Sequence, residues 1–170
     1  AISKLNNMKI ETLMYTGDNE KVASQVANEV GIEKYKSKML PYDKYSELEN
    51  MLNNKEKGEI IAFVGDGIND SPVLALSDVG ISMGGVGQQA AIEASDVVIM
   101  TDRLDKIVSS IKISKKTVKI IKENLTFAIG VKVLVLVLSA IGIAGMWQAV
   151  FADVGVTLIT ILNTLRILRK

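Results

Sequence analysis

The sequence predicts an α/β fold with a mostly parallel sheet, followed by a hairpin of two transmembrane helices. Short apolar runs alternate with amphipathic stretches over residues 10–99, and from Leu125 onward the chain is almost uncharged. Strands that alternate with helices form parallel sheets covered by helices, and about 20 apolar residues can cross a bilayer. A net charge of +1 gives no basic field for nucleic acid, and the absence of Cys and His excludes disulfides and zinc fingers within these 170 residues.

Four apolar runs are the expected strands, and the stretches between them are the expected helices. The strands are expected at 10–15, 59–64, 79–82 and 96–100, and the helices at 20–30, 44–54, 72–76 and 88–94. Gly, Asn, Asp or Pro bounds these segments, as is typical of element ends. Ligands bind at the carboxyl ends of parallel strands. The turns "TGDN" at 16–19 and "GDGINDSP" at 65–72 fall at such ends.

A basic helical stretch then leads into two apolar spans. Lysines 112, 115, 116, 119 and 122 precede the span at 125–147, and residues 166, 169 and 170 are basic after the span at 146–165. The positive-inside bias places both ends in the cytoplasm and the turn, near Gly142 and Gly145, outside. We expect an α/β domain over 1–104, a basic amphipathic linker helix over 105–124 and a membrane hairpin over 125–170. The alternative is an apolar hairpin inside a soluble protein.

Each predicted span contains one charged residue, Lys132 or Asp153. At 1.5 Å per residue, both lie roughly 13 to 16 Å from the turn, close to the bilayer centre. An unpaired charge there costs about 2.5 to 3.5 kcal/mol. The two residues are therefore expected to pair or to face a wet cavity. Intramembrane charges are candidates for function, although a purely structural ion pair or a snorkelling Lys132 is the alternative.

The two polar turns carry the groups that phosphoryl transfer requires. Asp66 and Asp70 flank a glycine after an apolar strand, and carboxylates suit a hard cation such as Mg²⁺. Thr16 offers a hydroxyl, Gly17 an amide, and a helix that starts near residues 18–19 favours a phosphate oxygen. Lys44 adds a fixed positive charge. Taken singly, these groups are explained as a turn, a helix cap and a solvated lysine.

Together, "TGDN", "MLPYDK" at 39–44 and "GDGINDSP" resemble the hinge-proximal half of the phosphorylation domain of P-type ATPases, which belong to the haloacid dehalogenase-like superfamily. The resemblance implies a partial haloacid dehalogenase-like domain over 1–104 and an aspartyl-phosphate intermediate. It implies these roles: Asp66 and Asp70 for Mg²⁺, with Asp70 also orienting the loop and its lysine, Thr16 and Gly17 for the phosphoryl group, Asp18 for hydrolysis, and Lys44 for charge neutralisation.

The chain departs from that family in one important respect. The nucleophile motif "DKTGT" is absent, as are the actuator motif "TGE" and the intramembrane "CPC". The resemblance therefore implies the C-terminal part of a pump whose missing N-terminal portion supplies the nucleotide-binding, actuator and "CPC" regions and binds most of the ATP. We expect no ATP hydrolysis by this polypeptide alone.

The last two predicted helices resemble one subclass of these pumps. The pattern of Asn124, Lys132 and "ADVG" at 152–155 is similar to the zinc, cadmium and lead exporters. The resemblance implies that Asp153 is a ligand of the transported ion and that Lys132 is its counter-charge. It also implies a multi-pass protein of the plasma membrane whose soluble part is cytoplasmic.

Two other interpretations remain. The chain could be a membrane-tethered phosphohydrolase of the same superfamily, which would need its own "DxD" nucleophile motif before the first strand. It could also be a noncatalytic membrane module that assembles with a separate N-terminal half.

Overall fold

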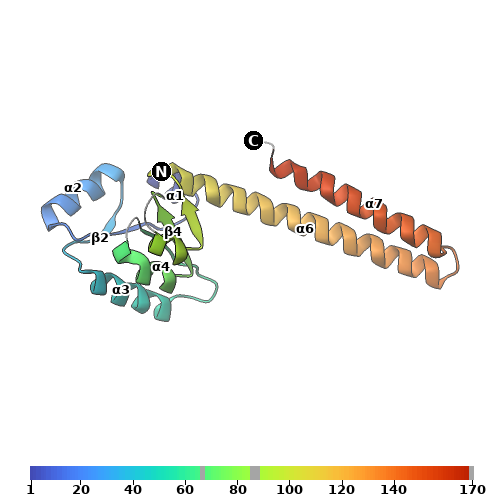
Figure 1. Cartoon of the computed structure of the whole chain (residues 1–170), viewed down its shortest axis with the longest axis horizontal. Helices are drawn as coiled ribbons and strands as arrows, with labels where there is room; N and C mark the ends of the chain where they lie inside the picture. The colour runs from blue at the N-terminus through green and yellow to red at the C-terminus, as the bar shows by residue number, and fades with distance from the viewer. Residues whose placement is uncertain (66–67, 85–88, 169–170) are drawn as a thin grey trace. The chain divides into compact units, whose positions relative to one another are not determined.

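The computed structural model of the chain describes residues 1–65, 68–84 and 89–168 (Figure 1). The chain divides into two compact units, Ala1–Val108 and Ser109–Lys170. The first unit holds all the strands, and the second holds a pair of long helices.

All strands of the first unit are parallel, as predicted, but they form two sheets. The smaller sheet pairs β1 (Leu13–Tyr15) with β2 (Lys34–Lys36). The larger sheet has the order β3-β4-β5, formed by β3 (Ala62–Gly65), β4 (Val79–Met83) and β5 (Val97–Ile99). Within the described chain, β1 and β3 each pair on one side only. The described strands therefore form two separate sheets in place of one.

The expected helices are present, with small shifts. They are α2 (Glu20–Val30), α3 (Pro41–Asn54), α4 (Ser71–Leu76), which follows the 3₁₀ turn η1 (Ile68–Asp70), and α5 (Gln89–Glu93). The prediction placed the start of α3 at Lys44, which is wrong by three residues. The helix starts earlier because proline fits its first position, and because the Leu40 amide donates to Asp43 Oδ2 at 2.8 Å.

Two elements were not predicted. Helix α1 (Ile2–Asn7) buries one residue, Leu5, and β2 has the sequence "KYK". Both lysines of β2 are exposed, because β2 lies at the edge of its sheet. A polar edge strand has no apolar run by which the sequence could reveal it.

The core of this unit lies against the larger sheet. Leu48 of α3 is 2% exposed, and Val73 and Leu74 of α4 are each 1% exposed. Gly80 of β4 allows α4 to approach, since a Cβ at residue 80 would lie 2.6 Å from the Leu74 carbonyl oxygen. Helix α4 is thereby held close to the sheet.

The second unit is a helical hairpin. Helix α6 (Asp105–Ala140) and helix α7 (Met146–Thr164) run side by side in opposite directions, and the short 3₁₀ turn η2 (Leu165–Ile167) follows (Figure 1). The turn at 141–145 contains the two glycines expected there. Gly142 has a left-handed φ of 76°, and Gly145 caps α7.

One long helix joins the predicted linker to the first predicted span. Helix α6 continues unbroken through the predicted linker (105–124) and into the first predicted span, and it ends at Ala140. In the described chain, one helix is long and apolar enough to cross a membrane, Met146–Ile167, with a mean hydropathy of 1.6. The crossing of a membrane by either helix and the predicted domain boundaries remain predictions.

Asp78 joins the start of β3 to the loop before β4. Its carboxylate accepts hydrogen bonds from the Ile61 amide at 2.8 Å and from Lys55 Nζ at 2.5 and 2.6 Å. These two donors, the Ile61 amide first, hold the pKa of Asp78 below its ordinary value. A carboxyl with a lowered folded-state pKa stabilises the fold above its unfolded pKa of about 3.9, and loses that contribution as pH falls through the folded pKa.

We therefore predict that Asp78→Asn reduces the hydrogen-exchange protection of β3 and β4 amides at pH 7. The difference from the parent chain should narrow progressively as pH falls below about 4, because the parent carboxyl then protonates. Exchange measured by mass spectrometry at each pH gives the ratio of the two chains. The exposed Glu33→Gln is the control, and a pH-independent ratio for Asp78→Asn would contradict the assignment.

Candidate functional site

The turn after β1 is fixed by short-range hydrogen bonds. Thr16 Oγ1 donates to Asp18 Oδ2 at 2.8 Å and accepts from the Asp18 amide at 3.1 Å. Asn19 caps α2, with its Oδ1 accepting from the Val22 amide at 3.1 Å. The helix start expected near residues 18–19 is confirmed. The Thr16 hydroxyl is thus held at a helix N-terminus, where an anion is favoured.

Gly17 lies exposed between these two residues. The part of the chain that the structure describes offers its amide no hydrogen-bond partner. A Cβ at this position would lie 3.4 Å from the Met39 carbonyl oxygen, so a larger residue would be tight against the loop after β2. The Gly17 amide is therefore a free donor beside the Thr16 hydroxyl.

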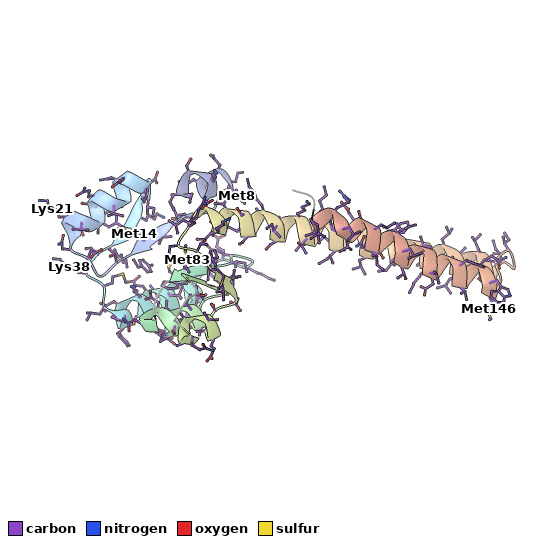
Figure 2. All side chains as sticks on the ribbon, turned by 45° about the horizontal axis from the view of Figure 1, so that its top comes forward. Met8, Met14, Lys21, Lys38, Met83 and Met146 are labelled. Carbon is purple, nitrogen blue, oxygen red and sulfur yellow. The ribbon has the colours of Figure 1, made fainter. Side chains whose placement is uncertain are left out.

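The loop after β2 supports this turn from one side. The Met39 amide donates to the Thr16 carbonyl at 3.0 Å, and the Lys38 amide donates to the Asp18 carbonyl at 2.7 Å. Lys38 has a left-handed φ of 55° and is labelled in this loop in Figure 2. The Glu20 carboxylate accepts from the hydroxyls of Ser37 at 2.6 Å and Tyr35 at 2.8 Å, which hold the pKa of Glu20 below its usual value.

Lys44 and Asp70 form the second part of the site. Lys44 Nζ donates to Asp70 Oδ1 at 2.9 Å, and the two side chains are 19% and 13% exposed. Asp70 packs on Gly65, where a Cβ would lie only 3.0 Å from the Asp70 Cβ. The glycine at the end of β3 therefore lets the carboxylate approach the strand closely, and Lys44 holds one of its oxygens.

Helix α3 links the two sheets. At one end Lys44 contacts Asp70, which follows β3. Further along, Met51 Sδ accepts a hydrogen bond at 3.1 Å from the hydroxyl of Tyr15, the last residue of β1. Burial first, and the nearby Glu47 carboxylate second, raise the pKa of Tyr15, which keeps its hydroxyl a donor. The turn after β1 and the loop after β3 are thus tied to the same helix.

Sequence reasoning missed Ser71, the first residue of α4. Its hydroxyl oxygen is buried, and the described residues provide no hydrogen-bond partner for it. Buried polar atoms are nearly always hydrogen-bonded, so this atom points to a group that belongs at the site. Its place directly after Asp70 is the one signal in the sequence that could have identified it.

The predicted magnesium site is described in part. Asp66 lies outside the described residues. Among those described, no group of three or more acidic side chains could hold a metal ion by itself. Asp70 has the oxygen chemistry that Mg²⁺ prefers, and Lys44 engages one of its two carboxylate oxygens. A magnesium site at this loop therefore needs Asp66 or a ligand from elsewhere.

The expected pairing of the two charges in the helical hairpin is confirmed. Lys132 Nζ of α6 lies 3.2 Å from Asp153 Oδ1 of α7. Both side chains are more than 60% exposed on the helix pair, so further ligands can reach the carboxylate. The residues come from opposite helices, and each neutralises the charge of the other.

A polar cluster ties the same two helices together near the other end of α7. Asn124 Nδ2 donates to Thr164 Oγ1 at 3.0 Å, and Asn163 Nδ2 donates to Asn124 Oδ1 at 2.8 Å. Arg166 Nη1 donates to Glu123 Oε2 at 3.0 Å. Asn124, noted in the sequence only as part of a pattern, therefore helps to set the register that brings Lys132 to Asp153.

Comparison with known proteins gives similarity along the whole chain. Residues 1–78 match a family model described as a haloacid dehalogenase-like hydrolase. The chain is 49% identical over 168 residues to a zinc-transporting ATPase of Synechocystis sp., covering 98% of this chain and 23% of the relative. It is 45% identical over 170 residues to a cadmium, zinc and cobalt-transporting ATPase of Bacillus subtilis, covering 99% of this chain and 24% of the relative. The chain thus spans about a quarter of these relatives.

Solved structures give the same result. A zinc-transporting PIB-type ATPase in the E2.Pi state matches 99% of this chain and 27% of its own, with a TM-score of 0.88 and 37% identity. A phosphoserine phosphatase matches 64% of this chain with a TM-score of 0.53 and 16% identity, which shows the fold alone. The parallel α/β fold of the first unit is therefore that of the haloacid dehalogenase-like proteins.

We predict that Lys44 and Asp70 couple strongly, because both side chains are largely withdrawn from water. In a double-mutant cycle with Lys44→Met and Asp70→Asn, we expect a coupling of about 1 to 3 kcal/mol in the free energy of unfolding. The exposed pair of Glu11 and Lys34 is the matched control, for which about 0 to 1 kcal/mol is expected. Urea unfolding measures both cycles. Equal coupling in the two pairs would mean that Lys44 is an ordinary surface lysine.

Proposed function

This chain is homologous over nearly its whole length to the zinc- and cadmium-transporting P-type ATPases, and we propose that it forms half of the phosphorylation site and part of the cation pathway of such a pump. One observation carries the proposal: the two turns that bear the candidate residues follow β1 and β3, and each of these strands has one unpaired edge in the described chain. A strand inserted there would end between the two turns.

The missing strand would complete a single parallel sheet. Each edge strand presents unpaired amide and carbonyl groups, and one added strand could pair with both β1 and β3. In a parallel sheet, its carboxyl end would lie beside Thr16 on one side and Asp70 on the other. The family resemblance implies that this strand carries the aspartate that is phosphorylated. It could also satisfy the buried hydroxyl of Ser71.

Around a phosphoaspartate, the residues of this chain would have complementary roles. The Thr16 hydroxyl would turn from Asp18 to a phosphoryl oxygen, and the free Gly17 amide would donate to another. Lys44, held by Asp70, would balance the negative charge. Asp18 would then be released to help position the attacking water. Asp66 and Asp70 would hold Mg²⁺, which supplies further neutralisation of the phosphoryl group.

In the helical hairpin, Asp153 is the proposed ligand of the transported divalent cation, with Zn²⁺, Cd²⁺ and Pb²⁺ as the candidates. Its pairing with Lys132 keeps the carboxylate neutralised while no cation is bound. A cation that binds Asp153 must displace the ammonium, and the returning ammonium would favour release of the cation. A single carboxylate is not selective for soft metals, so other regions of the pump would supply further ligands.

The proposed place of this hairpin is the plasma membrane, with the α/β unit in the cytoplasm. Only 6% of the most apolar 18-residue segment of the helix at Met146–Ile167 is buried by the rest of the described chain. Large apolar side chains on both helices are more than half exposed, among them Leu134, Leu136, Phe151 and Leu162. Water does not favour so much exposed apolar surface. Lipid, together with the remaining helices of the pump, would cover it.

We predict that the phosphorylation site assembles only from two parts. The chain should be mixed with a version of the Synechocystis zinc-transporting ATPase that lacks the matching quarter. Calorimetry in detergent should then show binding of Mg²⁺ with beryllium fluoride to the mixture and to neither part alone. Lys44→Met should weaken this binding by about tenfold or more, because the charge on the bound anion would lose its partner.

The exposed Lys57→Met serves as the control. Binding or phosphate release by this chain alone would contradict the proposal and favour a self-contained phosphohydrolase.

A chimaera tests the cation pathway. This chain should replace the matching quarter of the Synechocystis ATPase, and zinc-stimulated ATP hydrolysis should be measured in purified membranes. We expect Asp153→Ala to reduce the stimulation at least about tenfold, because a ligand is lost. The control Glu33→Ala removes an exposed carboxylate of the α/β unit and should leave the stimulation unchanged. Full stimulation in the Asp153→Ala chimaera would remove Asp153 from the cation site.

A further inference from the structure

Helix α6 carries a strongly basic face just before it becomes apolar. Lys115, Lys119 and Lys122 follow one another at spacings of four and three residues, which places them on one face of the helix. Together with Val118 and Phe127, they line a shallow groove along α6 that is largely open to its surroundings. We refer to these five residues as the lysine groove.

The positive charge of this groove is not balanced within the chain. In the described residues, no carboxylate forms an ion pair with Lys115, Lys119 or Lys122. The one acidic residue that lines the groove, Glu123, is engaged by Arg166 at 3.0 Å. Like charges three and four residues apart repel each other along a helix. An anionic partner would therefore stabilise this part of α6.

The groove is also partly apolar. Val118 is 50% exposed and Phe127 is 41% exposed, and both lie beside the lysines. Along α6, the cluster of basic residues ends at Lys122 and the apolar stretch, in which Lys132 is the one charge, begins at Leu125. Side chains stand outward along the whole of α6 and α7, with Met146 at the far, turn end of the hairpin (Figure 2). If the hairpin lies in a membrane as proposed above, the lysine groove lies at the level of the lipid headgroups.

We propose that the lysine groove binds anionic phospholipids, with the lysines at the phosphate and Phe127, which lies beyond them in the apolar stretch, against the upper part of the acyl chains. In a basic cluster immediately beside a membrane span, each lysine raises the affinity for an anionic lipid surface by about fivefold. A soluble polyanion would match the charge but not the apolar residues. The groove would thereby bring anionic phospholipids to the helix on which Lys132 lies. This proposal rests on the proposed membrane placement of the hairpin.

The test uses the complete 170-residue chain in bilayer nanodiscs that contain phosphatidylcholine and phosphatidylglycerol. Spin-labelled versions of the two lipids report how strongly each is immobilised by the protein. We expect the parent chain to select phosphatidylglycerol by about tenfold or more. The triple variant Lys115→Gln, Lys119→Gln, Lys122→Gln should reduce this selectivity to about twofold or less, and 0.5 M salt should weaken that of the parent chain.

The control carries the same loss of charge in the α/β unit, as Lys4→Gln, Lys21→Gln and Lys57→Gln, and should retain the selectivity. Equal selectivity in both triple variants, or none in the parent chain, overturns the lysine groove while leaving the membrane placement intact. A chain that does not insert into nanodiscs overturns the membrane placement and the groove together. Displacement of the labelled lipid by soluble polyphosphate at matched phosphate concentration would assign the groove to a soluble polyanion.

Discussion

The ion pair between Lys44 and Asp70 is the interaction on which the α/β unit depends. Lys44 belongs to α3, which follows the smaller sheet, and Asp70 follows the last strand before the chain enters α4. With no strand between β1 and β3 in the described chain, the two sheets share no backbone ladder. Helix α3 connects them, through the ion pair of Lys44 with Asp70 and through the contact of Met51 with Tyr15. Because few contacts join the two sheets, an additional strand could insert between them without breaking a backbone ladder.

The helical hairpin also depends on contacts between polar side chains. Its two helices bury little surface against each other, so apolar packing alone gives them little specificity. Two polar ties set the register instead: Lys132 with Asp153, and the cluster in which Asn124 and Asn163 contact each other. Hydrogen bonds between transmembrane helices contribute about 0.6 kcal/mol each on average. Polar contacts at two positions along the hairpin therefore restrict the sliding of one helix along the other better than one contact could.

Much of this could be predicted because it depends on local chemistry. Turn residues indicated where β1 and β3 end, and Asn19 indicated where α2 begins. The two glycines indicated the turn of the hairpin. The free-energy cost of an isolated charge indicated that Lys132 pairs with Asp153. The division of the sheet could not be predicted, because strand pairing depends on distant segments and no periodicity reports a missing neighbour. Strand β2 was missed because "KYK" is polar. The roles of the site residues stay predictions.

The two Lys–Asp pairs share a property that suits the proposed pump. In each, a lysine ammonium lies close to a carboxylate oxygen, at 2.9 Å in the α/β unit and at 3.2 Å in the hairpin. Lysine is a compact charge on a flexible stem, whereas arginine would grip both oxygens. A lysine can therefore hold a carboxylate in place and still move aside when a divalent cation arrives. The pairs differ in exposure, since the first is largely withdrawn from water and the second is open along the helices. A withdrawn pair suits a fixed site, and an open pair suits a site that must exchange its cation.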